Sequence, residues 1–335
     1  MTDPGLAPVD DPQLVSVVIV AYNAWPELEV AIESALCQSY RPLEVIVVDN
    51  DSSDATAEEI PRRFGDRVRY IRQPNLKNSG GYNSGFRAAA GNFIQFLDGD
   101  DVLAPNKIAK QMEVFRAHPE ADIVYGDIRQ FQALPGIPRW EDYPTRQYDD
   151  MVAAMITTNG YGASLSVLGA LLRRQTLERV GPWDESIHIT DWDYWLRAAW
   201  AGCRFVHCPG GPMGFYRRSP GQMTEDAAAM RSGMEEIWEK ALGYINREPY
   251  RQNVARCLAS VRFHQAIKQE RLTTSEALAK LRLARAADPG LFSPLAYPLA
   301  WALIVLPGGR SLARSRRLGK MRQGLARLLA LDAEG

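Results

Sequence analysis

The segment FIQFLDGDDVLAP, residues 93–105, decides how the fold is interpreted. Its first residues are mainly apolar, as in a buried strand, and three aspartates then fall within four positions. Alternate side chains of a strand share a face, so Asp98 and Asp100 point the same way if the extended backbone continues past Leu97. Two such carboxylates repel each other unless a cation lies between them, and Mg²⁺ and Mn²⁺ prefer oxygen ligands. The alternative is a solvated turn that leads into the next helix.

The sequence on both sides of this segment alternates between strand and helix patterns. Apolar runs rich in β-branched residues, such as SVVIVAY, are typical of strands buried on both faces. Helical spacing of apolar residues follows, as in WPELEVAIESALCQS, where Pro26 suits a helix start. The predicted strands are 16–22, 43–49, 68–73 and 93–98, and the predicted helices are 25–39, 53–60, 83–91 and 105–118. This alternation predicts an α/β fold, a mostly parallel sheet with helices on both faces.

The pattern divides the chain into three parts. Residues 1–13 are polar and lack the basic and apolar regions of a signal peptide, so we expect a flexible leader. Residues 14–223 form the predicted α/β domain, with a regular half, 14–125, and a looser half, 126–223. In the looser half, QALPGIPRWEDYPTRQ is interpreted as a loop, and GASLSVLGALLRR fits either a strand or a helix. Residues 224–335 have a helical pattern.

The composition excludes several classes of protein. The chain has 335 residues, of which 46% are hydrophobic, and its formal net charge of −1 gives no field that would attract nucleic acid. Four scattered cysteines without a CxxC pair indicate reduced core thiols of a cytoplasmic protein, not disulfides or a zinc site. No GxGxxG follows the first strand, which excludes a dinucleotide dehydrogenase. The apolar run at 299–306 is far shorter than the roughly 20 residues that span a bilayer.

Two other predicted strands also end in polar or aromatic residues. The first ends in VAYN, with Tyr22 and Asn23, and the second ends in VVDND, with Asp49. Because ligands of open α/β sheets bind outside the carboxyl ends of the strands, these side chains and the pair Asp98 and Asp100 should share one site. This set fits a nucleotide diphosphate, with the base on the aromatic face of Tyr22, polar groups of the base or ribose at Asp49, and the diphosphate on a metal held by the acid pair.

With these motifs in this order, the chain resembles the family 2 glycosyltransferases. These enzymes have the Rossmann-like GT-A fold and invert the configuration at the anomeric carbon of the transferred sugar. The matching motifs are VAYN, DNDSSD at 49–54, NSG at 83–85 and FLDGDD. The resemblance continues through LLRRQTLERVGPWDES and DWDYWLRAAWAG to FYRRSPG, and so covers residues 14–223. The combination of NSGGYNSGF with VVDND is most similar to the rhamnosyltransferase-like branch.

The resemblance implies a role for each matching residue. Tyr22 would pack on the nucleobase, Asp49 would bind the base, and Asp100 would contact the metal more directly than Asp98. The implied nucleotide-sugar site consists of Ala21, Tyr22, Asn23, Asp49, Asn83, Asp98 and Gly99, and the implied metal ligands are Asp98 and Asp100. The loop GPWDES would shape the acceptor side, with Trp183, Asp184 and Glu185. The first half of the domain would therefore bind the nucleotide sugar, and the second half the acceptor.

Asp191, in HITDWDYW, matches the general base of the family. Without the resemblance, Asp191 or Asp193 could equally be an acid favoured by the amino terminus of a helix. Asp184 and Glu185 are the next candidates for the base. The chain also departs from the family pattern: Thr190 precedes the base where glutamate is common.

Two further departures concern the phosphate and metal side of the site. Ser219 lies near the position of a late histidine that assists the metal in many relatives, and Tyr82 replaces a common arginine. These departures leave the third metal contact and the phosphate contacts open.

The resemblance implies a metal-dependent, inverting glycosyltransferase with Mn²⁺ or Mg²⁺ as cofactor. It would move a sugar from a UDP- or dTDP-linked donor to a hydroxyl of a glycan or lipid-linked glycan, in polysaccharide or cell-envelope synthesis. Two alternatives stay open: a polyprenyl-phosphate glycosyltransferase, and an inactive protein that binds sugar nucleotides. No nucleic-acid partner is expected, and whether the chain pairs into a homodimer is left open.

The carboxyl-terminal tail combines an apolar stretch with a basic one. Residues 308–328 contain seven arginines and lysines and no acid. If 311–329 is helical, Leu312, Leu318, Met321, Leu325 and Leu328 fall mostly on one side, as in a helix that lies in the interface of an anionic membrane. The protein would then be peripheral at the inner face of the cell membrane. The alternative is a helix packed on the protein itself or on a second subunit.

Overall fold

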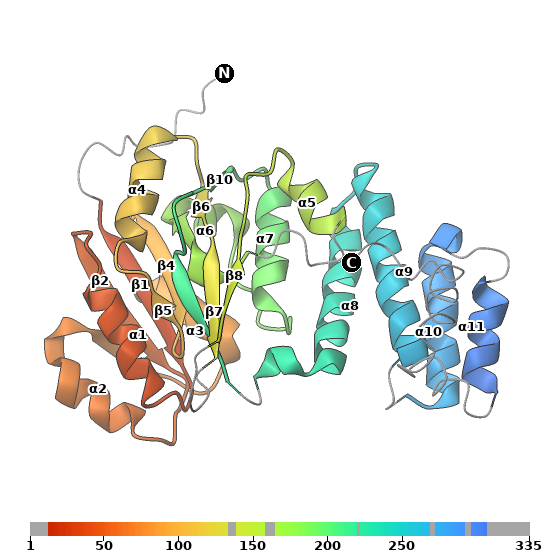
Figure 1. Ribbon diagram of the computed structural model, residues 1–335, viewed down its shortest axis with the longest axis horizontal. Helices are drawn as coiled ribbons and strands as arrows, with labels where there is room; N and C mark the ends of the chain where they lie inside the picture. The colour runs from red at the N-terminus through yellow and green to blue at the C-terminus, as the bar shows by residue number, and fades with distance from the viewer. Residues whose placement is uncertain are drawn as a thin grey trace. The chain divides into compact units, whose positions relative to one another are not determined.

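A seven-stranded sheet organises the amino-terminal part of the chain (Figure 1). The computed structural model describes residues 13–132, 139–157, 165–219, 222–268, 272–291 and 296–306. Residues 1–12 of the predicted leader and the predicted basic helix at 311–329 lie outside the described residues. The chain divides into two compact units: unit 1 is Met1–Met155 with Tyr161–Gln222, and unit 2 is Ile156–Gly160 with Met223–Gly335.

The sheet of unit 1 has the strand order β10-β6-β9-β4-β1-β2-β3. Its strands are β1 (Val15–Ala21), β2 (Leu43–Asp49), β3 (Arg69–Arg72), β4 (Phe93–Asp98), β6 (Ile123–Tyr125), β9 (Ala170–Arg173) and β10 (Phe205–His207). All neighbours are parallel except β9, which runs antiparallel to both β4 and β6. The predicted α/β fold with a mostly parallel sheet is therefore confirmed.

Helices cover both faces of this sheet because its central strands are apolar on both sides. Val17 and Ile19 of β1 belong to the core that also contains residues of α1, α2 and α4. On the other face α3 lies so close to β1 that a Cβ on Gly85 would be 2.1 Å from Val18 Cγ1. The helices of unit 1 are α1 (Glu27–Leu36), α2 (Thr56–Phe64), α3 (Lys77–Ala88), α4 (Lys107–Ala117), α6 (Arg174–Val180) and α7 (Thr190–Trp200), while α5 (Met151–Thr157) crosses the unit boundary.

A second, four-stranded sheet has the order β5-β11-β7-β8. Its strands are β5 (Val102–Leu103), β11 (Gly214–Arg218), β7 (Ile128–Gln132) and β8 (Arg139–Tyr143). The prediction of a loop is therefore wrong for residues 139–143, which form a strand that pairs antiparallel with β7. The pairing of β5 with β11 places β11 directly beside the chain that follows the three aspartates.

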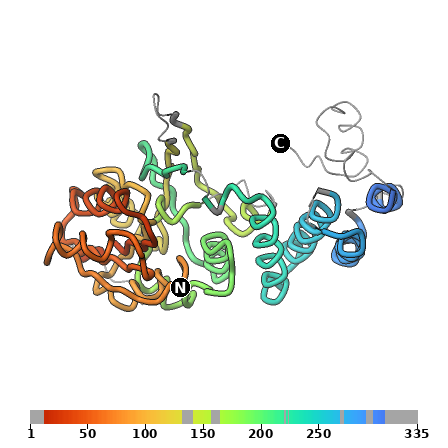
Figure 2. The backbone as a smooth tube through the Cα atoms, turned by 90° about the horizontal axis from the view of Figure 1, so that it is seen from below, coloured from red at the N-terminus to blue at the C-terminus, as the bar shows by residue number. Residues whose placement is uncertain are grey.

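Unit 2 is helical, as the sequence pattern predicts. It contains α8 (Ala227–Tyr244), α9 (Tyr250–Lys268), α10 (Thr274–Ala287) and α11 (Ala296–Val305). Consecutive helices pack against one another, and both views show α8, α9 and α10 side by side (Figure 1 and Figure 2). The buried carboxylate of Glu235 on α8 accepts hydrogen bonds from Arg262 on α9 and Lys280 on α10, which ties three helices together. Within the described residues, no helix has the length and hydrophobicity needed to cross a membrane.

Candidate active site

The carboxyl ends of β1, β2 and β4 lie at the same level of the sheet. Ala21 pairs in register with Asp49, and Val20 pairs with Asp98. The backbone N–H of Gly99 continues this ladder, since it donates to the carbonyl of Val20 at 2.9 Å. Three of the strand ends singled out in the sequence therefore meet at one edge of the sheet, as predicted for ligand sites of open α/β sheets.

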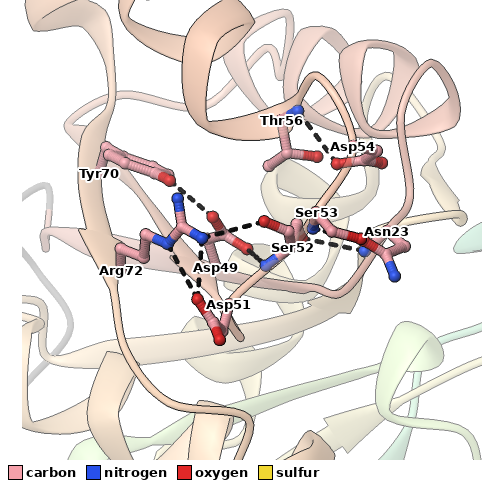
Figure 3. A network of polar contacts seen from close by, with 9 residues as sticks. All are labelled: Asn23, Asp49, Asp51, Ser52, Ser53, Asp54, Thr56, Tyr70 and Arg72. Atoms are coloured by element: carbon pink, nitrogen blue, oxygen red, sulfur yellow. Dashed lines mark hydrogen bonds and ion pairs between the residues drawn. The ribbon is translucent and has the colours of Figure 1, made fainter.

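The loop after β2 is held by a network of polar contacts (Figure 3). Asp49 is fully buried; its Oδ1 accepts from the Ser52 N–H at 2.9 Å and its Oδ2 from the Tyr70 hydroxyl at 2.6 Å. Burial, and secondly the hydrogen bond to Asp49, raise the pKa of Tyr70. Arg72 adds an ion pair with Asp51 at 2.8 Å on the exposed side. Asp49 therefore fixes the shape of this loop.

Asn23 joins the end of β1 to the same loop. Its backbone has a φ of +49°, and its Oδ1 accepts from the Ser53 N–H at 2.7 Å. Its own N–H donates to Ser52 Oγ at 2.9 Å. The neighbouring Tyr22 is 55% exposed, so its ring is accessible beside this loop. An exposed aromatic ring next to a rigid polar loop is a suitable surface for a planar base.

Asp98 is oriented by α3. Its Oδ1 accepts from the Tyr82 hydroxyl at 2.5 Å and from Asn78 Nδ2 at 3.2 Å. Burial, followed by the nearby charges of Asp100 and Asp191, raises the pKa of Asp98 to about 7. Tyr82 thus replaces the arginine common in the family with a neutral donor that holds a carboxylate. Asn78 belongs to no motif singled out in the sequence, so its contribution was not predicted.

Asp100 and Asp101 are held from the side of β11. Gln222 Nε2 donates to Asp100 Oδ2 at 3.2 Å, and Arg217 Nε donates to the Asp100 carbonyl at 2.9 Å. The Asp101 side chain is buried, and its Oδ1 accepts from the Arg217 N–H at 2.9 Å. Burial raises the pKa of both carboxyls, and for Asp101 the charges of Asp100 and Asp98 add to the effect. Asp101 closes a turn that begins at Asp98, because its N–H donates to the Asp98 carbonyl at 3.1 Å.

Asp191 lies in the first turn of α7, half-buried. Its Oδ1 accepts from the N–H of the next residue, Trp192, at 2.8 Å, and burial raises its pKa to about 6. Its charge raises the pKa of both Asp98 and Tyr82, which places it near the end of β4. Asp193, the alternative, is 1% exposed and forms an ion pair with Arg197 at 2.8 Å. Asp191 is therefore the acid of this pair that faces the site.

The loop 181–186 is fixed to α3 by Asn83. The Asn83 amide accepts from the Trp183 N–H and donates to the Trp183 carbonyl, both at 2.9 Å, and also donates to Glu185 Oε1 at 3.0 Å. Trp183 is 1% exposed and stacks on Tyr194 with 4.1 Å between ring centroids. Ser79 Oγ donates to the Asp184 carbonyl at 3.0 Å. Asn83 and Trp183 thus position the loop from inside, and Pro182, Glu185 and Ser186 form its exposed part.

The contacts of the two carboxylates at the end of β4, Asp98 and Asp100, bear on whether they can bind a metal ion. In the described part of the chain, no three His, Cys, Asp or Glu side chains have the arrangement of a complete metal site. The charge of Asp100 nevertheless raises the pKa of Asp98, and the side chains that donate to the two carboxylates, Tyr82, Asn78 and Gln222, are all neutral. Such a pair fits Mg²⁺ or Mn²⁺ of the kind that is completed by water and substrate phosphates.

Comparison with known proteins assigns this combination of fold and site to a family. Residues 16–181 match Glycosyl transferase family 2. The chain belongs to glycosyl transferase family 2. An uncharacterized glycosyltransferase of Nostoc sp. is 30% identical over 201 residues, which are 58% of each chain. The match therefore spans somewhat more than half the length of that relative. A UDP-Glc:alpha-D-GlcNAc-diphosphoundecaprenol beta-1,3-glucosyltransferase of Escherichia coli is 36% identical over 101 residues, 30% of this chain and 40% of that protein.

Solved structures with low sequence identity share the GT-A fold. S. aureus TarS 1-349 in complex with UDP-GlcNAc aligns with a TM-score of 0.63 at 16% identity, over 91% of this chain and 92% of that chain. The mannosyltransferase PcManGT of Pyrobaculum calidifontis, in complex with GDP-Man and Mn²⁺, aligns with a TM-score of 0.56 at 20% identity, over 98% of this chain and 91% of that one. These alignments agree with the sheet order and the α/β layers described above.

Proposed function

We propose that the protein is an inverting glycosyltransferase that moves a sugar from a nucleotide-diphosphate sugar to a hydroxyl of a glycan or lipid-linked glycan. The observation that carries the proposal is the meeting of Asp98, Asp100 and Asp191 at the end of β4, next to the end of β1 that leads into the exposed Tyr22. A relative whose name includes UDP-Glc and a diphosphoundecaprenol-linked sugar supports a UDP-type donor and a lipid-linked acceptor. A dTDP-linked donor is the second candidate, since both bases present similar edges to a rigid loop.

The donor nucleotide would bind across the ends of β1 and β2. The Tyr22 ring would stack on the base, and the loop held by Asp49 and Asn23 would present its backbone groups to the base and ribose. Asp49 is fully buried and already accepts two hydrogen bonds from the protein, so it would serve base binding through the loop that it shapes. Recognition by a preformed loop keeps the ordering cost of binding small.

The diphosphate would lie at the end of β4. Asp98 and Asp100 are suited to hold Mn²⁺ or Mg²⁺ there, and a structural neighbour was solved with Mn²⁺. When bound, such an ion neutralises the charge of the diphosphate leaving group. Tyr82 and Asn78 keep Oδ1 of Asp98 fixed, which leaves its Oδ2 to face the ligand.

Asp191 would act as the general base. Above a pKa of about 6 its carboxylate is ionised and accepts the proton of the acceptor hydroxyl while that oxygen attacks the anomeric carbon. The new C–O bond forms as the bond to the diphosphate oxygen breaks, so the configuration inverts. One carboxylate is sufficient because no covalent enzyme intermediate forms. Glu185, which accepts from Asn83, and Asp184 would line the acceptor side.

A donor screen tests the proposal directly. The full-length protein would be incubated with UDP-, dTDP- and GDP-sugars, with Mn²⁺ or with EDTA, and nucleotide diphosphate release would be measured. Saccharide, lipid-linked saccharide and polyprenyl-phosphate acceptors distinguish the proposed reaction from the polyprenyl-phosphate alternative. We expect metal-dependent release with one donor class and a hydroxyl acceptor. Binding of a sugar nucleotide without transfer to any acceptor class would support the inactive alternative instead.

A further inference from the structure

The last described helix, α11, is apolar on all sides. Residues 296–306 contain no charged side chain. Ala300 and Ile304 face inward and belong to the core that α11 shares with α9 and α10. Away from this core, Trp301 and Val305 of α11 and Leu306 directly after it are 47%, 40% and 60% exposed. These three residues are called the outer face of α11.

An outer face of this kind is unusual on a helix that packs at the surface of a unit. Surface helices normally carry polar residues opposite their buried stripe, and exposed apolar clusters mark interaction sites. The exposed large apolar residues of unit 1 are scattered over three segments, at Tyr22, Val30 and Leu76. The outer face of α11 instead gathers three within six positions of one helix end.

Positive charge lies near α11 in the structure and follows it in the sequence. On α10, Arg282 and Arg285 are exposed, and the Arg285 guanidinium lies 4.5 Å from the centroid of the Tyr297 ring at the start of α11. Directly after α11 the sequence contains seven arginines and lysines at 310–327, and no acid occurs before Asp332. That segment lies outside the described residues.

We propose that the outer face of α11 docks onto a bilayer that contains anionic lipid. Trp301, Val305 and Leu306 would enter the interface between headgroups and acyl chains, and the basic side chains would contact lipid phosphates. The helix is far too short to span a bilayer, so it would lie in the interface. The proposed chemistry at Asp98 and Asp191 plays no part in this contact, so docking and transfer can be tested separately.

The size and the charge of the face favour lipid over a second copy of the chain. A helix of ten residues is about 15 Å long, and three side chains cover far less than the roughly 800 Å² per partner of a stable protein interface. A contact between two copies through this face would also bring two basic segments together, which like-charge repulsion opposes. An anionic bilayer satisfies both the apolar and the basic side chains.

Vesicle flotation of the full-length protein tests the proposal. Vesicles would consist of phosphatidylcholine alone or of phosphatidylcholine with phosphatidylglycerol, at low and at high salt. We expect binding to the anionic vesicles at low salt, and weaker binding to neutral vesicles or at high salt. The double variant Trp301→Glu/Val305→Glu should lose at least about tenfold of this binding, because two carboxylates oppose both insertion and the lipid charge.

Matched variants separate docking from general effects on folding or solubility. Val30→Glu places a carboxylate at another 47% exposed position, on α1, and should keep full vesicle binding. Arg316→Glu/Arg317→Glu should weaken binding to anionic vesicles without changing the circular dichroism spectrum. If the wild-type protein stays unbound to anionic vesicles at low salt, the proposal is overturned. It is also overturned if Trp301→Glu/Val305→Glu only converts a dimer into a monomer in sedimentation velocity and leaves flotation unchanged.

Discussion

The three aspartates that follow β4 are held by different parts of the protein. Asp98 accepts from Tyr82 of α3, Asp100 accepts from Gln222, and Asp101 accepts from the Arg217 backbone of β11. Only the first two are placed to serve a bound cation, and the third fixes the turn in which they lie. The concentration of negative charge at this strand end therefore combines one proposed ligand site with one structural carboxylate.

The proposed metal site makes a prediction about Asp100. Asp100→Asn keeps the shape of the side chain and its acceptor oxygen for Gln222 but removes the negative charge. We expect transfer to fall by at least about 10²-fold, with the circular dichroism spectrum and the melting temperature nearly unchanged. Isothermal titration with Mn²⁺ and nucleotide diphosphate should show weaker metal binding. Full turnover of the wild-type protein in EDTA would show that no metal is needed.

The proposed base makes a prediction about Asp191. Asp191→Asn removes the proton acceptor and should lower transfer by at least about 10²-fold, while nucleotide diphosphate still binds. In the wild-type protein, transfer should rise with pH through a value near 6, because the raised pKa keeps the carboxyl protonated below it. Initial rates across the pH range, with calorimetry on the variant, measure both effects. A variant with near wild-type rate would move the base to Asp184 or Glu185.

At the scale of elements, β11 is the strand that braces the turn after β4. Asp101→Asn still offers an oxygen to the Arg217 N–H and removes a buried charge, so we expect unchanged or higher stability. Asp101→Ala leaves that N–H without its acceptor and should cost about 1–3 kcal/mol in the free energy of unfolding. Urea denaturation of the two variants, side by side, gives the comparison. Equal stability of the two variants would mean that the contact does not brace the turn.

The central strands could be predicted from the sequence because their burial leaves a continuous apolar signal. Predicted strands 16–22, 43–49 and 93–98 agree with β1, β2 and β4 to within one residue. The second half of unit 1 carries weaker local signals: β8 is a polar hairpin strand whose partner is β7. Within the run GASLSVLGALLRR, Ala170–Arg173 becomes β9 only because it inserts between β4 and β6, a contact that local periodicity does not encode.

The site was predictable where a motif lies at a strand end and not where its contacts are long-range. The register of β1, β2 and β4 brings together the expected residues Ala21, Asp49 and Asp98. The donors that orient the acids come from distant positions, such as Gln222, which lies 122 residues from Asp100. Side-chain amides and backbone N–H groups have no sequence pattern that marks them as partners of a given carboxylate. The shape of the site is thus encoded in the tertiary packing.

At the scale of the whole molecule, two groups of carboxyls respond to pH in opposite directions. Burial raises the pKa of Asp191 to about 6, and burial with Asp100 raises that of Asp98 to about 7. These acids bind protons more strongly in the folded state, so they oppose folding as pH rises from about 4 to 7. Glu235 is the opposite case: although burial opposes it, Lys280 and Arg262 lower its pKa. Its contribution to stability is present above about pH 4.5 and is lost below.

Asp98 and Asp191 titrate at higher pH than Glu235, so their effects on stability can be observed separately. The protein without ligand should therefore become more stable as pH falls from 8 to about 5.5. Protonation of Asp98 and Asp191 should raise the free energy of unfolding by a few kcal/mol across this range. The double variant Asp98→Asn/Asp191→Asn, which cannot titrate at these positions, serves as the control and should melt at a nearly constant temperature. Mn²⁺ with nucleotide diphosphate should stabilise the wild-type protein most at high pH, where both carboxylates are ionised and available to ligands. Differential scanning fluorimetry over the pH range measures both effects. A melting temperature that falls steadily from pH 8 to 5.5 without ligand would show that ionised Asp98 and Asp191 do not destabilise the folded state.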